Sequence, residues 1–266
     1  MLSEAEVSAA AADLLRAEET RVQIGLLSRR HPEMTMDDAY AVQKALVARK
    51  LALGRKVIGW KIGLTSKAMQ YALNIDIPDS GILLDDMAFA DGATIPAGRF
   101  IQPRVEAEIA FVMKAPLSGR VSRSEVLAAT EAVVPALEIL DTRIRRVDPV
   151  SGHARRIVDT ISDNAANAGI VLGRHRHAPG AFDLRWVGAI VARDGEVEET
   201  GLGAGVLNDP AEGIVWLAAR MAQYGQRIEA GQVILSGSFI RPVECSPGAV
   251  ISADFGPFGR VDCTFA

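Results

Sequence analysis

The chain has 266 residues, of which 49% are hydrophobic and 23% are charged, and its formal net charge at pH 7 is -4. This composition is typical of a globular protein with a substantial core, and no apolar run approaches the ~20 residues that a membrane span requires. The negative net charge argues against a nucleic-acid partner, whose phosphates lysine and arginine would have to neutralise, so we expect a small ligand.

The N-terminal segment and the cysteines indicate the compartment. The first twenty residues are rich in acidic residues and alanine, whereas a secretory signal begins with basic residues followed by an apolar stretch. Cys245 and Cys263 lie too far apart for a CxxC redox or zinc pair, so both are predicted to be packing residues. We therefore expect a cytoplasmic protein.

The first fifty residues carry the start signals of two helices. Ser3 and Glu6 have the spacing of a capping box before an alanine-rich stretch that reaches about residue 18. Thr35 and Asp38 open a second helix, which Gly54 closes. The N-terminal part of the chain is therefore predicted to be helical.

From residue 56 onward the pattern changes to short runs of β-forming residues, with a hairpin signal at Asp194-Gly195 and a further hairpin at the end of the chain. Helices follow Ser122 and Asp209 and interrupt the strands. The predicted strands are residues 56–64, 105–113, 135–140, 184–192 and 232–238. The fold class is therefore α+β, with a small helical part at residues 1–55 and a mixed β domain at residues 56–266 that curls on itself.

Glu106 and Glu108 are two residues apart in the segment RVEAEIAFV. In a strand both carboxylates point to one face, while the apolar residues beside them point to the other. Two acids can then converge on one ligand. The alternative for this pair alone is a half-exposed strand whose glutamates face water.

Glu138 lies inside the apolar run VVPALEIL, where an unpaired carboxylate would pay a large desolvation penalty. A positive charge should therefore lie near it. Arg143 could supply that charge, and so could a hard divalent cation held by Glu106, Glu108 and Glu138 together. Because no cysteine or histidine is placed near these acids, magnesium or manganese fits such a site better than zinc.

Lys61 lies among apolar neighbours in VIGWKIGL, and lysines are rarely buried unless they are paired or functional. The alternative is a lysine whose stem packs while its ammonium group reaches water. Near a metal site, desolvation and the cation would lower the pKa of Lys61, and the carboxylates would raise it. Such a lysine could donate or accept a proton.

A locally basic stretch contains arginines at positions 143, 145, 146, 155 and 156. A stretch of this kind is usually a solvated loop or a subunit contact. It is also able to attract an anionic substrate.

Six segments together resemble the 2-oxopent-4-enoate hydratase group of the fumarylacetoacetate hydrolase superfamily: GWKIGLTSKAMQ, GILLDDM, PRVEAEIAFV, PALEILDTRI, DTISDNAANAG and LSGSF. The resemblance extends from about residue 20 to the C-terminus. Within the group, three segments are most similar to the branch that hydrates a seven-carbon dioate: HPEMTMDDAYAVQ, DTISDNAANAG and DLRWVGAIVARDGEVEETGLGAGVLNDPA.

The resemblance implies roles for five residues. Glu106, Glu108 and Glu138 fall on the family's metal-binding acids, Lys61 on its active-site lysine, and Asp79, in IPDSGILL, on another active-site position. The family's mixed β fold agrees with the α+β assignment. Its members are usually homo-oligomers, often multiples of five, so the resemblance also implies a homo-oligomer such as a pentamer or decamer.

The implied reaction adds water to 2-hydroxyhepta-2,4-dienedioate and gives 4-hydroxy-2-oxoheptanedioate, with Mg²⁺ or Mn²⁺ chelating the C1 carboxylate and the C2 oxygen. Lys61, together with Asp79, is predicted to move the protons. Arg241, just beyond a predicted strand in SGSFIRPV, is predicted to bind the distal carboxylate, since arginine suits bidentate carboxylate binding. The alternative for Arg241 is a surface arginine at a strand end.

Other functions stay open at this point. A hydratase of five-carbon dienols and a metal-dependent decarboxylase of 4-oxalocrotonate type would share the same site. An aldolase would instead use Lys61 as a Schiff-base nucleophile. A non-catalytic partner subunit would bind the metal only for structure.

Overall fold

The structure is a computed structural model that describes residues 1–67, 70–71 and 77–266. The N-terminal part is helical, as predicted, and contains α1 (Glu4–Thr20), α2 (Leu27–Arg30) and α3 (Met36–Ala52). Both predicted capping boxes are present: the hydroxyl groups of Ser3 and Thr35 accept hydrogen bonds from the first turns of α1 and α3. In the described part of the chain, no helix is long and apolar enough to cross a membrane.

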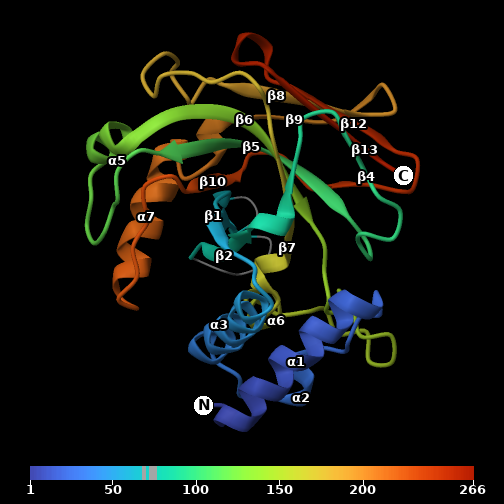
Figure 1. Cartoon of the computed structure of the whole chain (residues 1–266). Helices are drawn as coiled ribbons and strands as arrows, with labels where there is room; N and C mark the ends of the chain where they lie inside the picture. Colours follow the sequence, from blue (N-terminus) through green and yellow to red (C-terminus); the bar gives the residue numbers. More distant parts are fainter. Residues whose placement is uncertain (68–69, 72–76) are drawn as a thin grey trace.

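The rest of the chain is built on two sheets, a large one that curls and a small one that lies over it (Figure 1). The large sheet has the order β2-β1-β10-β5-β6-β7-β3, and β11 also pairs with β5. Its strands are β1 (Val57–Gly63), β2 (Asp79–Leu84), β3 (Ala88–Phe89), β5 (Arg104–Met113), β6 (Thr130–Leu140), β7 (Asn167–Leu172), β10 (Val233–Ser238) and β11 (Val243–Glu244).

The small sheet has the order β4-β13-β12-β8-β9 and lies over β5 and β6 in Figure 1. Its strands are β4 (Ala93–Ile95), β8 (Gly188–Arg193), β9 (Glu196–Leu202), β12 (Val250–Asp254) and β13 (Arg260–Phe265). Both predicted hairpins are present, because β8 and β9 are joined at Asp194-Gly195, and β12 pairs with β13. The positive φ angles of 55° and 86° at Asp194 and Gly195 fit a primed turn.

The side chains of β5 alternate between the main core and the opposite face of the sheet, which carries the site. Val105, Ile109 and Phe111 point into the main core, which they share with residues of the small sheet. Ala110 points the opposite way, into a smaller cluster with residues of β6, β7 and β10. Since side chains alternate between the faces of a strand, the even-numbered acids of β5 lie on this second face, inside the curl of the large sheet.

Helices complete the fold. α5 (Arg123–Ala129) and α7 (Pro210–Ala222) follow their predicted caps, and α7 packs close to β10, where a side chain at Gly213 would lie 2.6 Å from a backbone oxygen. The N-terminal helices share a core with α6 (Ile157–Ser162), through Val158 and Ile161. The helical part thus packs against a segment far along the chain, and the domain boundary at residue 55 stays a prediction.

Two strand predictions had wrong boundaries. The strand predicted at residues 184–192 begins only at Gly188, because Asp183 accepts a hydrogen bond from the backbone of Arg185 and forms a turn there. The strand predicted from Pro135 begins at Thr130, and Pro135 lies within the pairing of β6 with β5. Proline is usually confined to strand starts and edges, which is why its position misled the prediction.

Candidate active site

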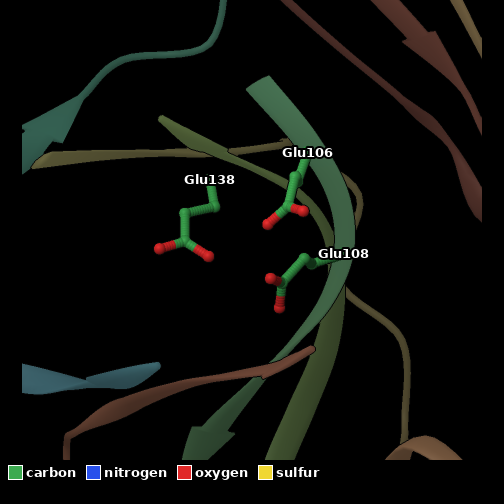
Figure 2. Close-up of side chains that lie close together, drawn as sticks. All are labelled: Glu106, Glu108 and Glu138. Atoms are coloured by element: carbon green, nitrogen blue, oxygen red, sulfur yellow. The ribbon is translucent and has the colours of Figure 1, made fainter. Parts of the chain in front are cut away.

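The three predicted glutamates converge. Glu106 and Glu108 come from β5 and Glu138 from β6, and Glu106 lies directly opposite Glu138 in the register of the two strands. One carboxylate oxygen from each residue lies within 4.8 Å of those of the other two. Figure 2 shows the three carboxylates pointing toward a common space. The backbone therefore gathers three oxygen ligands from two neighbouring strands.

The donor set at this place suits a hard cation. Glu108 and Glu138 are 0% exposed, and Glu106 is half-buried. Glu108 Oε2 accepts a hydrogen bond of 2.7 Å from the Gly237 backbone N–H, but Glu108 Oε1 and both oxygens of Glu138 have no hydrogen-bond partner among the described residues. Buried carboxylate oxygens without partners are costly, so the residues present fit a divalent ion with oxygen ligands.

Without a cation, the pKa values of the three carboxyl groups lie above their ordinary range. Burial, followed by repulsion from Glu138, raises the pKa of Glu106 from 4.5 to about 8. The pKa of Glu108 is raised well above its usual range by the same two causes, and burial also raises that of Glu138. A bound cation would lower these pKa values, because it favours the charged form of each acid.

Lys61 reaches the same space from β1 and is only 3% exposed, so the alternative of an ammonium group in water is wrong. Its Nζ lies 3.4 Å from Glu138 Oε1. Burial favours the neutral amine, but the carboxylates, Glu138 and Asp79 foremost, outweigh it and raise the pKa of Lys61. The ammonium form therefore persists beside the three glutamates.

Asp79 opens β2 on the same face of the sheet as Lys61, because Gly63 is paired with Asp79 and Lys61 with Gly81. The carboxyl group of Asp79 is buried, its Oδ1 has no hydrogen-bond partner in the described part of the chain, and burial raises its pKa against the opposing effect of Lys61. A side chain at Gly63 would overlap Asp79 Oδ1 and come within 3.1 Å of Lys61 Nζ. Because Gly63 has no side chain, there is room for the Asp79 carboxyl group and the Lys61 ammonium group beside it.

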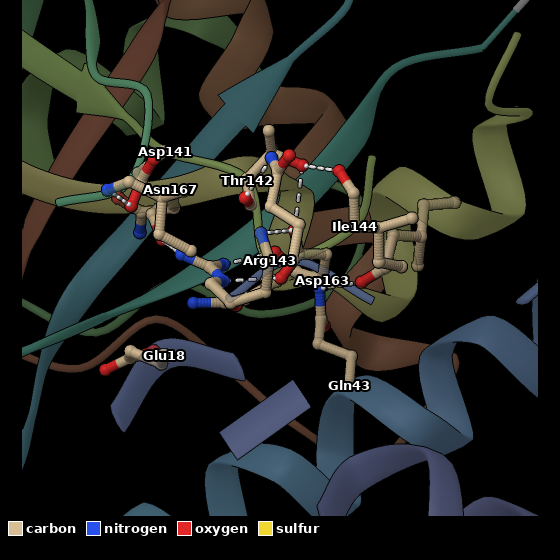
Figure 3. A network of polar contacts seen from close by, with 12 residues as sticks. Glu18, Gln43, Asp141, Thr142, Arg143, Ile144, Asp163 and Asn167 are labelled. Atoms are coloured by element: carbon tan, nitrogen blue, oxygen red, sulfur yellow. Dashed lines mark hydrogen bonds and ion pairs between the residues drawn. The ribbon is translucent and has the colours of Figure 1, made fainter. Parts of the chain in front are cut away.

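Arg143, the alternative partner of Glu138, is engaged elsewhere, so that interpretation is wrong (Figure 3). Its Nε lies 2.5 Å from Asp163 Oδ1, and its Nη atoms donate to the backbone oxygens of Asn167 and Asp163 at 3.1 and 2.6 Å. The guanidinium group is buried, and each of its three nitrogens donates a hydrogen bond. Its role is to join the segment after β6 to the turn that precedes β7.

Arg241 is not gathered with these residues. Its side chain is 78% exposed and pairs with Glu199 of β9 at 2.6 Å. Its predicted contact with a distal carboxylate stays a prediction.

A left-handed turn beside β2 was missed. Asn164, Ala165 and Ala166 all have positive φ, between 52° and 57°, which is unfavourable for residues other than glycine. The Asn164 side chain accepts a hydrogen bond from the Ile82 N–H at 2.8 Å and donates one to the Ile82 carbonyl at 2.9 Å, which fixes the free edge of β2. The sequence signal for such a turn is weak, because asparagine tolerates the left-handed conformation but the two alanines after it do not favour it.

The chain is similar to known enzymes in sequence and in structure. No family model matches the chain. It is 51% identical over 251 residues to the 2-oxo-hept-4-ene-1,7-dioate hydratase of Escherichia coli, an alignment that covers 94% of each chain. It is 41% identical over 257 residues to the 2-keto-4-pentenoate hydratase of Paraburkholderia xenovorans, an alignment that covers 96% of this chain and 93% of that relative. The structure of 4-oxalocrotonate decarboxylase from Pseudomonas putida G7, complexed with magnesium and adipate, matches with a TM-score of 0.94 at 33% identity, covering 100% and 99%.

Proposed function

The chain belongs to the 2-oxopent-4-enoate hydratase group of the fumarylacetoacetate hydrolase superfamily, and from this premise we propose that it is a metal-dependent hydratase of 2-hydroxyhepta-2,4-dienedioate. The product is 4-hydroxy-2-oxoheptanedioate. The observation that carries the proposal is the convergence of three glutamates beside a buried lysine, in a place where carboxylate oxygens lack partners. The 51% identity to a hydratase of the seven-carbon substrate supports the choice of chain length.

We propose that Glu106, Glu108 and Glu138 hold the ion, and that it is Mg²⁺ or Mn²⁺. Structures of the related decarboxylase contain magnesium in one case and calcium in another, which supports a hard cation with oxygen ligands. When bound, such a cation supplies a Lewis acid for the C1 carboxylate and the C2 oxygen of a 2-oxo acid. Gly237 contributes by holding one oxygen of Glu108 in place through its backbone N–H.

Lys61 and Asp79 are the groups that we propose to move protons. Hydration of the dienol needs a proton at C5, loss of the proton from the C2 hydroxyl, and then addition of hydroxide at C4 and a proton at C3, so that one water is consumed. The Lys61 ammonium can donate at C5, because the surrounding carboxylates keep it protonated. Asp79, across Gly63 from Lys61, is a second buried group that can hold a proton between these steps.

A decarboxylase of 4-oxalocrotonate type is the second candidate. The chain is 34% identical over 265 residues to the decarboxylase of Pseudomonas sp. strain CF600, and it matches the structure of such an enzyme over its whole length. A decarboxylase and a hydratase need the same chelation of a 2-oxo acid, so the residues of the site do not separate them. The product does.

The test is a spectrophotometric assay of metal-loaded protein with the five- and seven-carbon dienols and with 4-oxalocrotonate, followed by product identification. The proposal predicts loss of dienol absorbance with the seven-carbon substrate and formation of the 4-hydroxy-2-oxo acid. Carbon dioxide release from 4-oxalocrotonate in its place would select the decarboxylase. Full activity after chelation, with borohydride trapping of a 2-oxo acid on Lys61, would select an aldolase.

The assembly and compartment are also proposals. We propose a homo-oligomer, with a pentamer or decamer as the form that the family resemblance favours, working in the cytoplasm. Sedimentation velocity of the purified protein measures the assembly. A stable complex with a decarboxylase, without turnover of any dienol, would instead indicate a non-catalytic partner subunit.

A further inference from the structure

Three arginines gather at the end of the site where β5 begins, and we call Arg104, Arg146 and Arg155 the arginine group. Arg104 is the first residue of β5 and precedes Glu106 by two positions, so its side chain leaves the strand on the same face as Glu106 and Glu108. Two residues of a strand advance ~7 Å, which is comparable to the length of an extended seven-carbon chain. Arg104 lies opposite the last residue of β6 in the register of the two strands, so it marks one end of the strand pair that carries the three glutamates.

Arg146 and Arg155 are held next to Arg104 by their backbone. The Arg155 N–H donates to the Arg146 carbonyl at 2.9 Å, and Val147 forms a β-bridge with Ala154, so the two arginines flank a hairpin-like loop. The guanidinium group of Arg146 donates to Gln102, just before β5, at 3.1 and 3.2 Å. Arg155 Nη1 donates to the Thr142 hydroxyl at 3.0 Å. This loop lies within the locally basic stretch of the sequence.

The arginine group carries more positive charge than its neighbours neutralise. Arg104 pairs with Glu244 at 2.5 Å, yet its buried Nε has no hydrogen-bond partner among the described residues. Among the residues that the structure describes, no carboxylate lies within 4.0 Å of Arg146 or Arg155, although both arginines are half-buried. An anion would therefore gain charge-assisted hydrogen bonds here.

The charges facing each arginine support the same conclusion. Burial, followed by repulsion from Arg104 and Arg155, lowers the pKa of Arg146 to about 10, against the weaker opposing effects of Glu244 and Asp141. Burial likewise lowers the pKa of Arg155, with Asp163, Asp79 and Asp159 opposing it and Arg104 adding to it. Geometry gives the same placement, because Thr142, which accepts a hydrogen bond from Arg155, lies two residues past the end of β6, the strand that carries Glu138.

We propose that the arginine group, with Arg155 as its principal member, binds the distal carboxylate of the dioate substrate and so determines the preference for a dicarboxylic dienol. This inference rests on the proposed function for the identity of the substrate. The ion proposed at the glutamates would take the end of the substrate that carries the C1 carboxylate. Arg104 begins β5 about one chain length away, and Arg155 is held at the same end by its hydrogen bond to Thr142, just past β6. Arg241, by contrast, is exposed and already paired with Glu199.

The test compares Arg155→Met and Arg146→Met with Arg227→Met, a control at an exposed arginine paired with Glu229 outside the site. Each variant is assayed, metal-loaded, on the seven-carbon dicarboxylic and the five-carbon monocarboxylic dienol. Arg155→Met is expected to reduce kcat/KM on the dioate by about 10- to 100-fold, and to change it less than about threefold on the monocarboxylate. Arg155→Lys, which keeps a charge without the planar fork, is expected to recover part of the loss.

Equal losses on both dienols in Arg155→Met would overturn the inference, as would a selective loss on the dioate in Arg241→Ala with none in the arginine group. A binding measurement separates this inference from the proposed function. Calorimetry with adipate and hexanoate is expected to show a preference for adipate that Arg155→Met and Arg146→Met abolish and Arg227→Met retains, even if no dienol is turned over. An unchanged preference in both arginine-group variants would refute the site.

Discussion

Glu106 on β5 and Glu138 on β6 lie directly opposite each other in an antiparallel pair, inside a curled sheet. Like charges opposite each other destabilise a sheet, and burial adds the cost of desolvation. The Lys61 ammonium, 3.4 Å from Glu138, offsets part of this cost, but three carboxylates share its single charge. The pair is therefore best explained as half of a cation site, and the following predictions test that explanation.

Replacing Glu138 with Gln removes one ligand and one negative charge while the size of the side chain is kept. We expect the affinity for Mg²⁺ to fall by more than about 100-fold, a larger loss than outer-shell partners cause, and turnover to fall with it. Calorimetric titration with Mg²⁺ measures the change. The matched control is Glu131→Gln, an exposed glutamate on the same strand that pairs with Arg176, and this variant should bind the ion like the parent. Equal affinity in the two variants would contradict the site.

Lys61→Met separates proton transfer from cation binding. The variant keeps all three glutamates, so we expect Mg²⁺ affinity to stay the same or to rise, since a competing positive charge is gone. Turnover should fall by at least about 100-fold, the usual contribution of a general acid or base. Lys114→Met, at an exposed lysine just past β5, is the control. Intact turnover in Lys61→Met would remove Lys61 from the mechanism.

The raised pKa of Glu106 predicts how cation stabilisation varies with pH. Without a cation, folding raises this pKa from 4.5 to about 8, so stability is fully present below 4.5 and is lost as the pH rises toward 8. A bound cation favours the charged carboxylates and removes the loss. The increase in Tm on adding Mg²⁺ should therefore grow from about pH 5 to pH 8.

Scanning calorimetry of the parent and of Glu106→Gln at several pH values checks this dependence. The variant has no titrating group at position 106, so its Mg²⁺-induced shift in Tm should be small and should vary less with pH. A shift in the parent that shrinks as the pH rises would contradict the assignment.

Gly237 is predicted to be required for the orientation of Glu108. It has a φ of 118°, its N–H donates to Glu108 Oε2, and a side chain here would overlap Thr65. We expect Gly237→Ala to lower the free energy of unfolding by about 1–3 kcal/mol and to weaken Mg²⁺ binding. Gly231→Ala is the matched control, because Gly231 has a φ of 82° but no atom within 4 Å of the added methyl group. A normal Mg²⁺ affinity in Gly237→Ala would show that this N–H does not position the ligand.

The chemistry of the site was predictable from local pattern. The alternation along β5 placed Glu106 and Glu108 on one face, and the two residues lie there. The apolar run around Glu138 predicted a positive charge nearby, and the Lys61 ammonium group lies 3.4 Å away. Burial of Lys61 followed from its neighbours in the same way. These inferences succeed because the period of a strand and the cost of a buried charge depend on the adjacent residues alone.

What the sequence could not predict depends on pairing between distant segments. The register that sets Glu106 opposite Glu138 is fixed by the whole sheet, and the Gly237 N–H comes from a third strand. The left-handed turn at Asn164 is held by Ile82, far away in the chain, and overrides the local preference of alanine. Two sources of positive charge were also left open for Glu138, and only the folded chain shows that Arg143 is not one of them, because it pairs with Asp163.

The most direct test is to remove the cation with a chelator, measure turnover of 2-hydroxyhepta-2,4-dienedioate, and titrate Mg²⁺ back. The account predicts that activity disappears and returns in proportion to ion bound at one site per chain, in the parent and in Glu131→Gln but not in Glu138→Gln. Full activity in the chelated protein, or restored activity in Glu138→Gln at the same Mg²⁺ concentration, would contradict it.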